Sequence, residues 1–200
     1  MASLGTFERV YQAIKQWLRR GEFHAGERLE PGRLSDRLNA SVTPVRDALN
    51  RLTGERLVDA PPHEGFRVPL ASEIMLRQLY AWHRDLVFLA IARRSLDPRA
   101  VPSDMRAGED LVGRQQALFL LLASSSGNLE LVDAIRTVIA RLAPYQHLEA
   151  GLLDSLEEET SAIAKALERG DRATLRRLLY SYHRRRERIV PQLVARASRP

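Results

Sequence analysis

Residues 34–52 read LSDRLNASVTPVRDALNRL, and this stretch decides the fold of the first third of the chain. Leu34 and Leu38 lie one helical turn apart, and an apolar stripe with helical spacing resumes after a short turn at residues 39–42. Thr43-Pro44 predicts a helix cap followed by proline at the first helical position. Two helices joined by so tight a turn indicate a helix-turn-helix.

The sequence on either side completes this unit. Upstream, the apolar residues between positions 7 and 18 follow one buried helical stripe, with Thr6 as the expected N-cap. Downstream, residues 57–60 and 66–68 are expected to be two strands around a turn rich in Pro and Gly, and so to form a β-hairpin wing. Residues 1–70 are therefore predicted to form a winged helix-turn-helix domain.

This fold predicts where DNA would lie, because the N-terminal end of the second helix enters the major groove with its dipole favouring phosphate. Arg46 can pair with a guanine or a phosphate there. Each residue taken singly can equally be an ordinary solvated side chain, but their confinement to one helix end and one hairpin favours an interface. The predicted DNA-contacting residues are Arg33, Ser41, Thr43, Arg46 and Arg51, and at the wing tip His63, Gly65 and Arg67.

The quoted run resembles the signature of GntR-type bacterial transcription regulators, and residues 56–68 are similar to the wing of that family. The motif includes Pro44, which joins the predicted DNA-binding residues. The chain departs from the pattern by placing Val42 where the family has a base-reading Arg, and Glu64 where many relatives carry Arg or His. Both changes remove positive charge. DNA binding is expected, at an operator that differs from the family's commonest one, with Val42 against a thymine methyl group.

Residues 71–200 are predicted to be an all-helical bundle, because their apolar stripes are wide and none of their segments has the pattern of a strand. Ser72 with Glu73 is a good helix start. Two segments, residues 123–128 and 163–171, resemble landmarks of the FadR and FCD branch, in which this domain binds an effector and forms the dimer. The expected helices cover about residues 72–94, 103–123, 128–143, 152–168 and 172–196.

Many members of that branch bind a divalent metal through one Asp and three His. The corresponding positions here hold Gln115, Phe119, Thr160 and Tyr182, so the resemblance implies an effector pocket without a metal or another cofactor. A register slipped by one residue, which would use His183, is the alternative.

The effector pocket is expected to use polar residues of these helices, although for each residue taken singly surface exposure or a satisfied core hydrogen bond is the more common explanation. A pocket that holds Arg and His would suit an organic anion such as a carboxylate. The predicted effector-binding residues are Arg77, His83, Arg84, Arg114, Gln115, His147 and Tyr182, with Tyr145 and Tyr180 as weaker candidates.

Composition excludes several classes of protein. The 200 residues contain no Cys, which excludes disulfides and thiolate chemistry, and the sequence has no phosphate loop or catalytic serine or zinc motif, so an enzyme is not expected. No apolar run reaches membrane-spanning length. The net charge of +6 makes nucleic acid a plausible partner. Residues 184–188 are mostly Arg, and they predict a solvated helix face or an additional contact to an anion.

Together these features predict a cytoplasmic, homodimeric bacterial regulator that binds a pseudo-palindromic double-stranded operator and responds to a small effector, with no membrane partner. Repression is what the resemblance implies, although the residues do not separate a repressor from an activator. The alternative is an architectural or non-specific DNA-binding dimer that has no effector.

Overall fold

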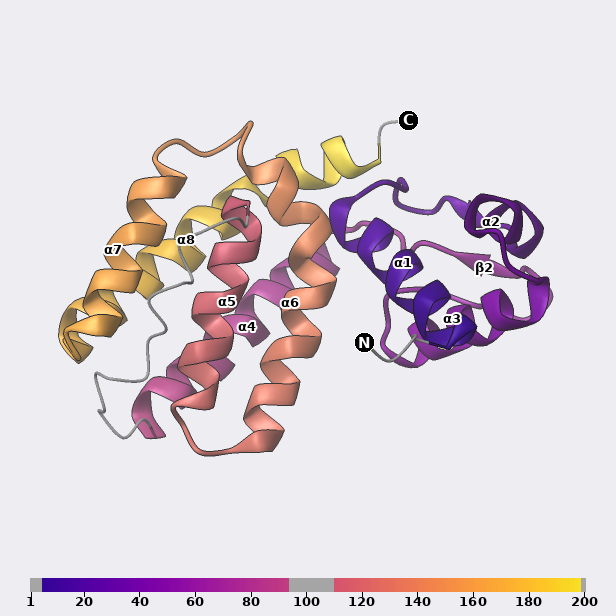
Figure 1. Ribbon diagram of the computed structural model, residues 1–200. Coiled ribbons are helices and arrows are strands. Elements are labelled where there is room, and N and C mark those ends of the chain that lie inside the picture. The colour runs from indigo at the N-terminus through magenta and orange to yellow at the C-terminus, as the bar shows by residue number, and fades with distance from the viewer. Residues whose placement is uncertain (1–4, 94–109, 199–200) are drawn as a thin grey trace.

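The computed structural model describes residues 5–93 and 110–198, which form a small N-terminal domain beside a larger helical bundle (Figure 1). The described part is mainly α-helical, as expected. The N-terminal domain contains α1 (Thr6–Arg20), β1 (Arg28–Leu29), α2 (Pro31–Leu38), α3 (Val42–Gly54) and β2 (Phe66–Arg67).

The core of the N-terminal domain is the predicted apolar stripe of α1 packed against that of α3. Val10 and Ile14 of α1 are fully buried, as are Val45 and Leu49 of α3. Gly21 ends α1 in the left-handed conformation with φ 69°, where glycine is favoured. This packing holds α2 and α3 as a helix-turn-helix.

Both N-caps that the sequence predicts in this domain are wrong, that of α1 by one residue and that of α3 by two. The N-cap of α1 is Gly5, and Thr6 is the first helical residue. The N-cap of α3 is Ser41, so that Thr43 and Pro44 both lie within the first turn. Proline is tolerated there because the first N–H groups of a helix have no intrahelical partner.

The wing differs from the predicted hairpin. β2 pairs with β1 in antiparallel register, with Arg28 opposite Arg67, and the predicted strand at residues 57–60 is reduced to a single bridge between Asp59 and Arg67. Leu57 and Val58 are instead buried in the domain core. No pattern in the sequence predicts β1, because two residues are too few to show an alternation.

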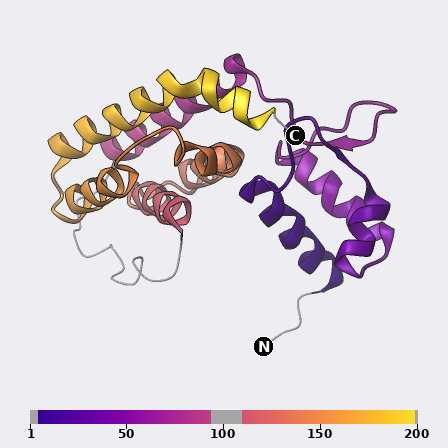
Figure 2. The ribbon, with the colours of Figure 1, turned by 90° about the horizontal axis from the view of Figure 1, so that it is seen from above.

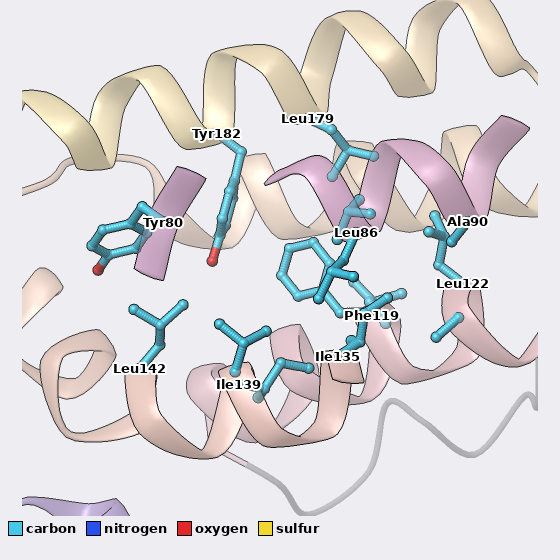
Figure 3. Packing of buried hydrophobic residues seen from close by; sticks show 14 of the residues in the cluster. Tyr80, Leu86, Ala90, Phe119, Leu122, Ile135, Ile139, Leu142, Leu179 and Tyr182 are labelled. Atoms are coloured by element: carbon cyan, nitrogen blue, oxygen red, sulfur yellow. The ribbon is translucent and has the colours of Figure 1, made fainter. Parts of the chain in front are cut away.

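The C-terminal bundle packs α4 and α8 side by side, with the other helices covering them (Figures 1 and 2). Figure 3 shows the core, where Tyr182 from α8 points inward beside Tyr80 from α4. Within the described ranges, no helix is long and apolar enough to cross a membrane. The helices are α4 (Glu73–Arg93), α5 (Leu111–Ser124), α6 (Leu129–Glu149), α7 (Leu156–Glu168) and α8 (Arg172–Ala197).

Two helix boundaries in the bundle also differ from expectation. α6 continues through Pro144 to Glu149 rather than ending near residue 143, because Tyr145 and Gln146 are buried on its core side and packing overrides the helix-breaking tendency of proline. α7 begins at Leu156 rather than at residue 152. The expected start of a helix at residue 103 lies outside the described residues.

The two domains meet along a seam between α1 and α6 (Figure 1). Arg19 at the end of α1 donates a hydrogen bond to the side-chain oxygen of Gln116 on α5. The backbone N–H of Ala25 donates to the carbonyl of Ala197, at the end of α8, over 3.2 Å. Polar bonds therefore connect the DNA-binding domain to two helices of the bundle besides α6.

Candidate nucleic-acid interface and buried polar site

The N-terminal end of α3 is exposed and largely free of internal partners. The Ser41 hydroxyl makes no capping bond to the helix, and Arg46 makes no ion pair or hydrogen bond with the described residues. Val42 leaves 41% of its surface exposed, which is unusual for a large apolar side chain. A helix end that leaves its N–H groups, hydroxyls and one guanidinium unpaired is suited to binding an anionic surface.

The exposed face of α3 continues one turn beyond Arg46. Thr43, Arg46 and Asn50 are all exposed, and the spacing of three and four residues places them on one side of the helix. Asn is the side chain whose amide matches adenine in the major groove. The sequence analysis missed Asn50, although the helical spacing was sufficient to find it.

Arg33 and Arg51 lie apart from this face. Arg33, on α2, leaves 83% of its side chain exposed and pairs with Glu30 over 3.0 Å. Arg51 turns toward α1, where its guanidinium lies 4.0 Å from the ring centre of Tyr11 and pairs with Glu8 and Glu55. The guanidinium of Arg51 is therefore already held within the domain.

The wing tip is exposed but partly neutralised. His63 and Gly65 are exposed and both have positive φ. The Arg67 guanidinium pairs with Glu64 over 2.9 Å, whereas Arg28 on the neighbouring strand is exposed and makes no ion pair with the described residues. The guanidinium of Arg28 lies beside Gly65, 3.8 Å from where a Cβ would be. Arg28 is therefore a cation of the wing without an ion pair among the described residues. No sequence pattern identified it, because none predicts β1.

The predicted effector residues do not gather at one place. Arg77 and Arg84 on α4 pair with carboxylates at the bundle surface, and Arg114 on α5 pairs with Glu157. His147 is partly exposed near the domain seam. The three predicted residues that the structure buries in the bundle are His83, Gln115 and Tyr182.

Two buried histidines face each other in the bundle core. The Nδ1 atom of His183 lies 2.7 Å from the Leu179 carbonyl, which can only accept, so this nitrogen carries the proton. His83 Nδ1 then donates to His183 Nε2 over 3.1 Å, and His83 Nε2 is left as a buried acceptor without a partner among the described residues. Burial lowers the pKa of both rings, and that of His183 to about 4.

A buried charge cluster, formed by Arg186, Glu149 and Glu159, adjoins these histidines. Arg186 is 0% exposed and lies 2.9 Å from Glu149 and 2.8 Å from Glu159. Its guanidinium stacks on Tyr182, 3.3 Å from the ring centre, and Tyr80 donates to Glu149 over 2.9 Å. Burial raises the pKa of Glu149, although Arg186 and Tyr80 oppose the shift.

This cluster corrects the interpretation of residues 184–188 as a solvated face. Arg184 and Arg188 are exposed, but Arg186 is buried because it lies one helical turn from both Tyr182 and Val190, which face the core. Arg185 is half-buried and pairs with Glu159. Composition alone does not show that one arginine within this run of like charges is buried.

The residues at the family's metal-ligand positions do not fit a metal ion. Gln115 donates to Thr160 over 3.0 Å, and Phe119 has no lone pair. The alternative through His183 does not fit either, since its Nδ1 faces the Leu179 carbonyl and its Nε2 faces His83. In the two described ranges, His, Asp and Glu nowhere gather in threes that could hold a metal.

Comparison with known proteins agrees with this geometry. Residues 6–68 match the family of bacterial regulatory proteins called the gntR family. The chain is 26% identical over 150 residues to the HTH-type transcriptional regulator McbR of Escherichia coli K12, covering 75% of this chain and 64% of McbR. It is 37% identical over 87 residues to the transcriptional repressor GlaR of the same organism, covering 42% of this chain and 40% of GlaR. The matched segments thus span less than two thirds of both relatives.

Among solved structures, a GntR transcriptional regulator from Rhodococcus sp. RHA1 superposes with a TM-score of 0.78 at 20% identity, covering 94% of this chain and 99% of that one. At this identity the likeness shows the fold. The fold and the family match together identify residues 6–68 as a helix-turn-helix domain similar to that of bacterial regulatory proteins. The match to the gntR family is confined to residues 6–68, the N-terminal domain.

Proposed function

We propose that the protein regulates transcription in the bacterial cytoplasm by binding a specific operator with α3 and the wing. The observation that carries this proposal is the exposed N-terminal end of α3, where Arg46 is free of internal partners. Two copies would be needed to read a two-fold operator, so we propose a homodimer. The gntR family match supports the DNA-binding part of the proposal.

Replacing Arg46 with Ala is expected to weaken operator binding by about 1–3 kcal/mol, because a bidentate contact to a base or phosphate is lost. Fluorescence anisotropy on DNA from upstream of the protein's own gene measures this, with scrambled DNA as reference. Arg184→Ala is the matched control, since Arg184 is equally exposed but lies on α8. Equal losses in both variants would contradict the assignment of α3 as the recognition helix.

We further propose that a small effector binds the bundle core without a metal ion. The buried, unpartnered Nε2 of His83 and Nε of Arg186 support this, because a polar ligand would supply the hydrogen bonds they lack. One metal ion held tightly per chain would refute the metal-free part of the proposal. Repression, as the name of GlaR states for that relative, is the mode we propose.

A chain of hydrogen bonds connects this core to the DNA-binding domain. Tyr182 receives a bond from Gln146 over 3.3 Å, Gln146 receives one from Gln116 over 2.9 Å, and Gln116 receives one from Arg19 of α1. A ligand that moves Tyr182 would therefore alter the bond that fixes the end of α1. This chain of bonds supports coupling between the binding of the effector and the affinity for DNA.

Replacing Gln116 with Leu is expected to reduce this coupling by about 0.5–2 kcal/mol, since the chain of bonds is cut at the seam. The measurement is operator affinity with and without an effector found by screening metabolites in the anisotropy assay. Thr137→Val is the control, because the Thr137 hydroxyl bonds to the Asp133 carbonyl within α6 and lies outside this chain of bonds. If both variants keep the full response, the chain of bonds does not transmit it.

A DNA-binding dimer without an effector is the second candidate. It predicts little preference for any sequence, whereas a regulator prefers its site by roughly 10³-fold or more. The exposed Val42 and Asn50 favour the regulator, because apolar and amide side chains contribute base selectivity rather than charge. Selectivity measured against scrambled DNA separates the two.

A further inference from the structure

A cavity of about 230 Å³ lies at the seam between the winged domain and the bundle. Its walls come from the end of α1 and the loop after it, the segment after α3, and parts of α4, α6 and α8. Most of its inner surface is apolar, with Phe23, Leu57, Met75 and Leu79 among the lining residues. It is separate from the buried cluster around Tyr182, none of whose members lines it.

The charges around this cavity are all of one sign. Arg20, Arg56, Arg141 and Arg196 line it, and so do two histidines, whereas the acidic residue Asp59 lines an adjoining hollow. Arg196 donates to the Gly151 carbonyl over 2.9 Å and is thus partly satisfied. The cavity therefore combines an apolar floor with an excess of cationic donors.

None of these four guanidinium groups has a carboxylate partner among the described residues, and Arg56 and Arg141 come from opposite sides of the seam. Arg56, at the rim, follows α3 in the winged domain, and Arg141 lies half-buried on α6 of the bundle. Neither makes an ion pair or a hydrogen bond with the described residues. Burial and the charge of Arg56 lower the pKa of Arg141, and Tyr145 and Asp59 oppose this only in part. The seam thus brings together two positive charges, one from each domain, and Asp59, which lines an adjoining hollow with both of them, compensates them only in part.

The backbone conformation at Arg56 is a second unfavourable feature of the seam. Arg56 has a φ of 59° directly after the C-cap of α3, a left-handed position where glycine is preferred. A side chain there is strained relative to glycine. An arginine at this position is therefore unfavourable both for the local backbone and for the charge balance of the seam.

We propose that this cavity binds a small amphipathic carboxylate, with the carboxylate between Arg56 and Arg141 and its apolar body against the floor. The anion would replace a repulsion between the domains with two charge-assisted hydrogen bonds, one to each domain. Because the ligand contacts both domains, its binding favours the domain arrangement in which the two guanidinium groups lie together. This site is distinct from the bundle core and does not depend on what DNA the protein recognises.

Hexanoate is the probe, and hexanamide, which has the same shape without the charge, is its control. The full-length protein without DNA is titrated by isothermal calorimetry and by thermal unfolding, up to about 20 mM to detect millimolar dissociation constants. The expected result is saturable binding of hexanoate that raises the unfolding midpoint, with no comparable effect of hexanamide. Equal binding of the two compounds, or no saturable binding of hexanoate, would overturn the proposal.

Arg56→Gly and Arg141→Met locate the site without weakening the fold. The first removes the left-handed side chain and the second removes a half-buried charge, so both variants are expected to be at least as stable as the parent. Each is expected to bind hexanoate roughly tenfold to a hundredfold more weakly, as the loss of a hydrogen bond to a charged group implies. Arg184→Gln is the matched control on the surface of α8. Unchanged hexanoate affinity in both test variants would refute the site.

Discussion

Replacing Arg186 with Met is expected to lower the free energy of unfolding by about 3–5 kcal/mol, the range observed when one member of a buried ion pair is removed. Arg186 is fully buried, and its loss would leave Glu149 and Glu159 facing each other in the core. The stacking contact with Tyr182 would be lost as well. Urea denaturation at pH 7, followed by circular dichroism, measures the effect.

The triple variant Arg186→Met, Glu149→Gln and Glu159→Gln tests whether uncompensated charge is the cause. It removes all three charges, so it is expected to recover a large part of the lost stability. Arg184→Met, two residues away and exposed, is expected to change stability by less than about 0.5 kcal/mol. If Arg186→Met costs no more than Arg184→Met, the cluster does not stabilise the fold as described.

Acidification is expected to destabilise the bundle between about pH 6.5 and pH 4. An imidazole in the unfolded chain takes up a proton near pH 6.5, whereas burial lowers the pKa of His183 in the folded protein to about 4. Within this window the unfolded chain binds more protons, so stability falls as the pH falls. For His183 the loss between pH 7 and pH 5 is about 2 kcal/mol, and His83, whose pKa is also lowered, acts in the same direction.

The measurement is the free energy of unfolding at pH 7 and pH 5 for the parent and for His183→Gln. Glu149 acts in the opposite direction because burial raises its pKa, but it is present in both proteins and cancels in the comparison. The variant is expected to lose less stability on acidification than the parent. His63→Gln, in the exposed wing, is expected to retain the parent's pH dependence. Equal slopes for all three proteins would show that the buried pair does not control acid stability.

The sequence was sufficient to predict the winged domain because its signals are local. The stripes of α1 and α3 and the stop at Gly21 each depend on residues within a few turns. The wing was less predictable, since β1 and β2 are two residues each and pair Arg28 with Arg67 and Leu29 with Phe66, far apart in the chain. The end of α6 was also missed, because burial of Tyr145 rather than local propensity carries the helix through Pro144.

The candidate sites also include one that could be predicted from the sequence and others that could not. The exposed end of α3 could be predicted, because helix position and residue type suffice to indicate a DNA-facing residue. The buried role of Arg186 and the pairing of His83 with His183 could not be predicted, since both depend on which helices pack together. The two histidines are 100 residues apart in the chain. The same holds for the cavity at the seam, which is made by both domains.

The close approach of Gly21 to Pro144 offers a way to fix the two domains covalently. A Cβ placed on Gly21 would lie 3.7 Å from the Cβ of Pro144, which is within the usual separation of the Cβ atoms in a disulfide. The chain contains no Cys, so an introduced pair at these positions would have no competing thiol. The left-handed backbone at Gly21 would disfavour a cysteine there whether it is reduced or oxidised. A crosslink that opens with a reductant would allow one sample to be compared with its domains locked and then released.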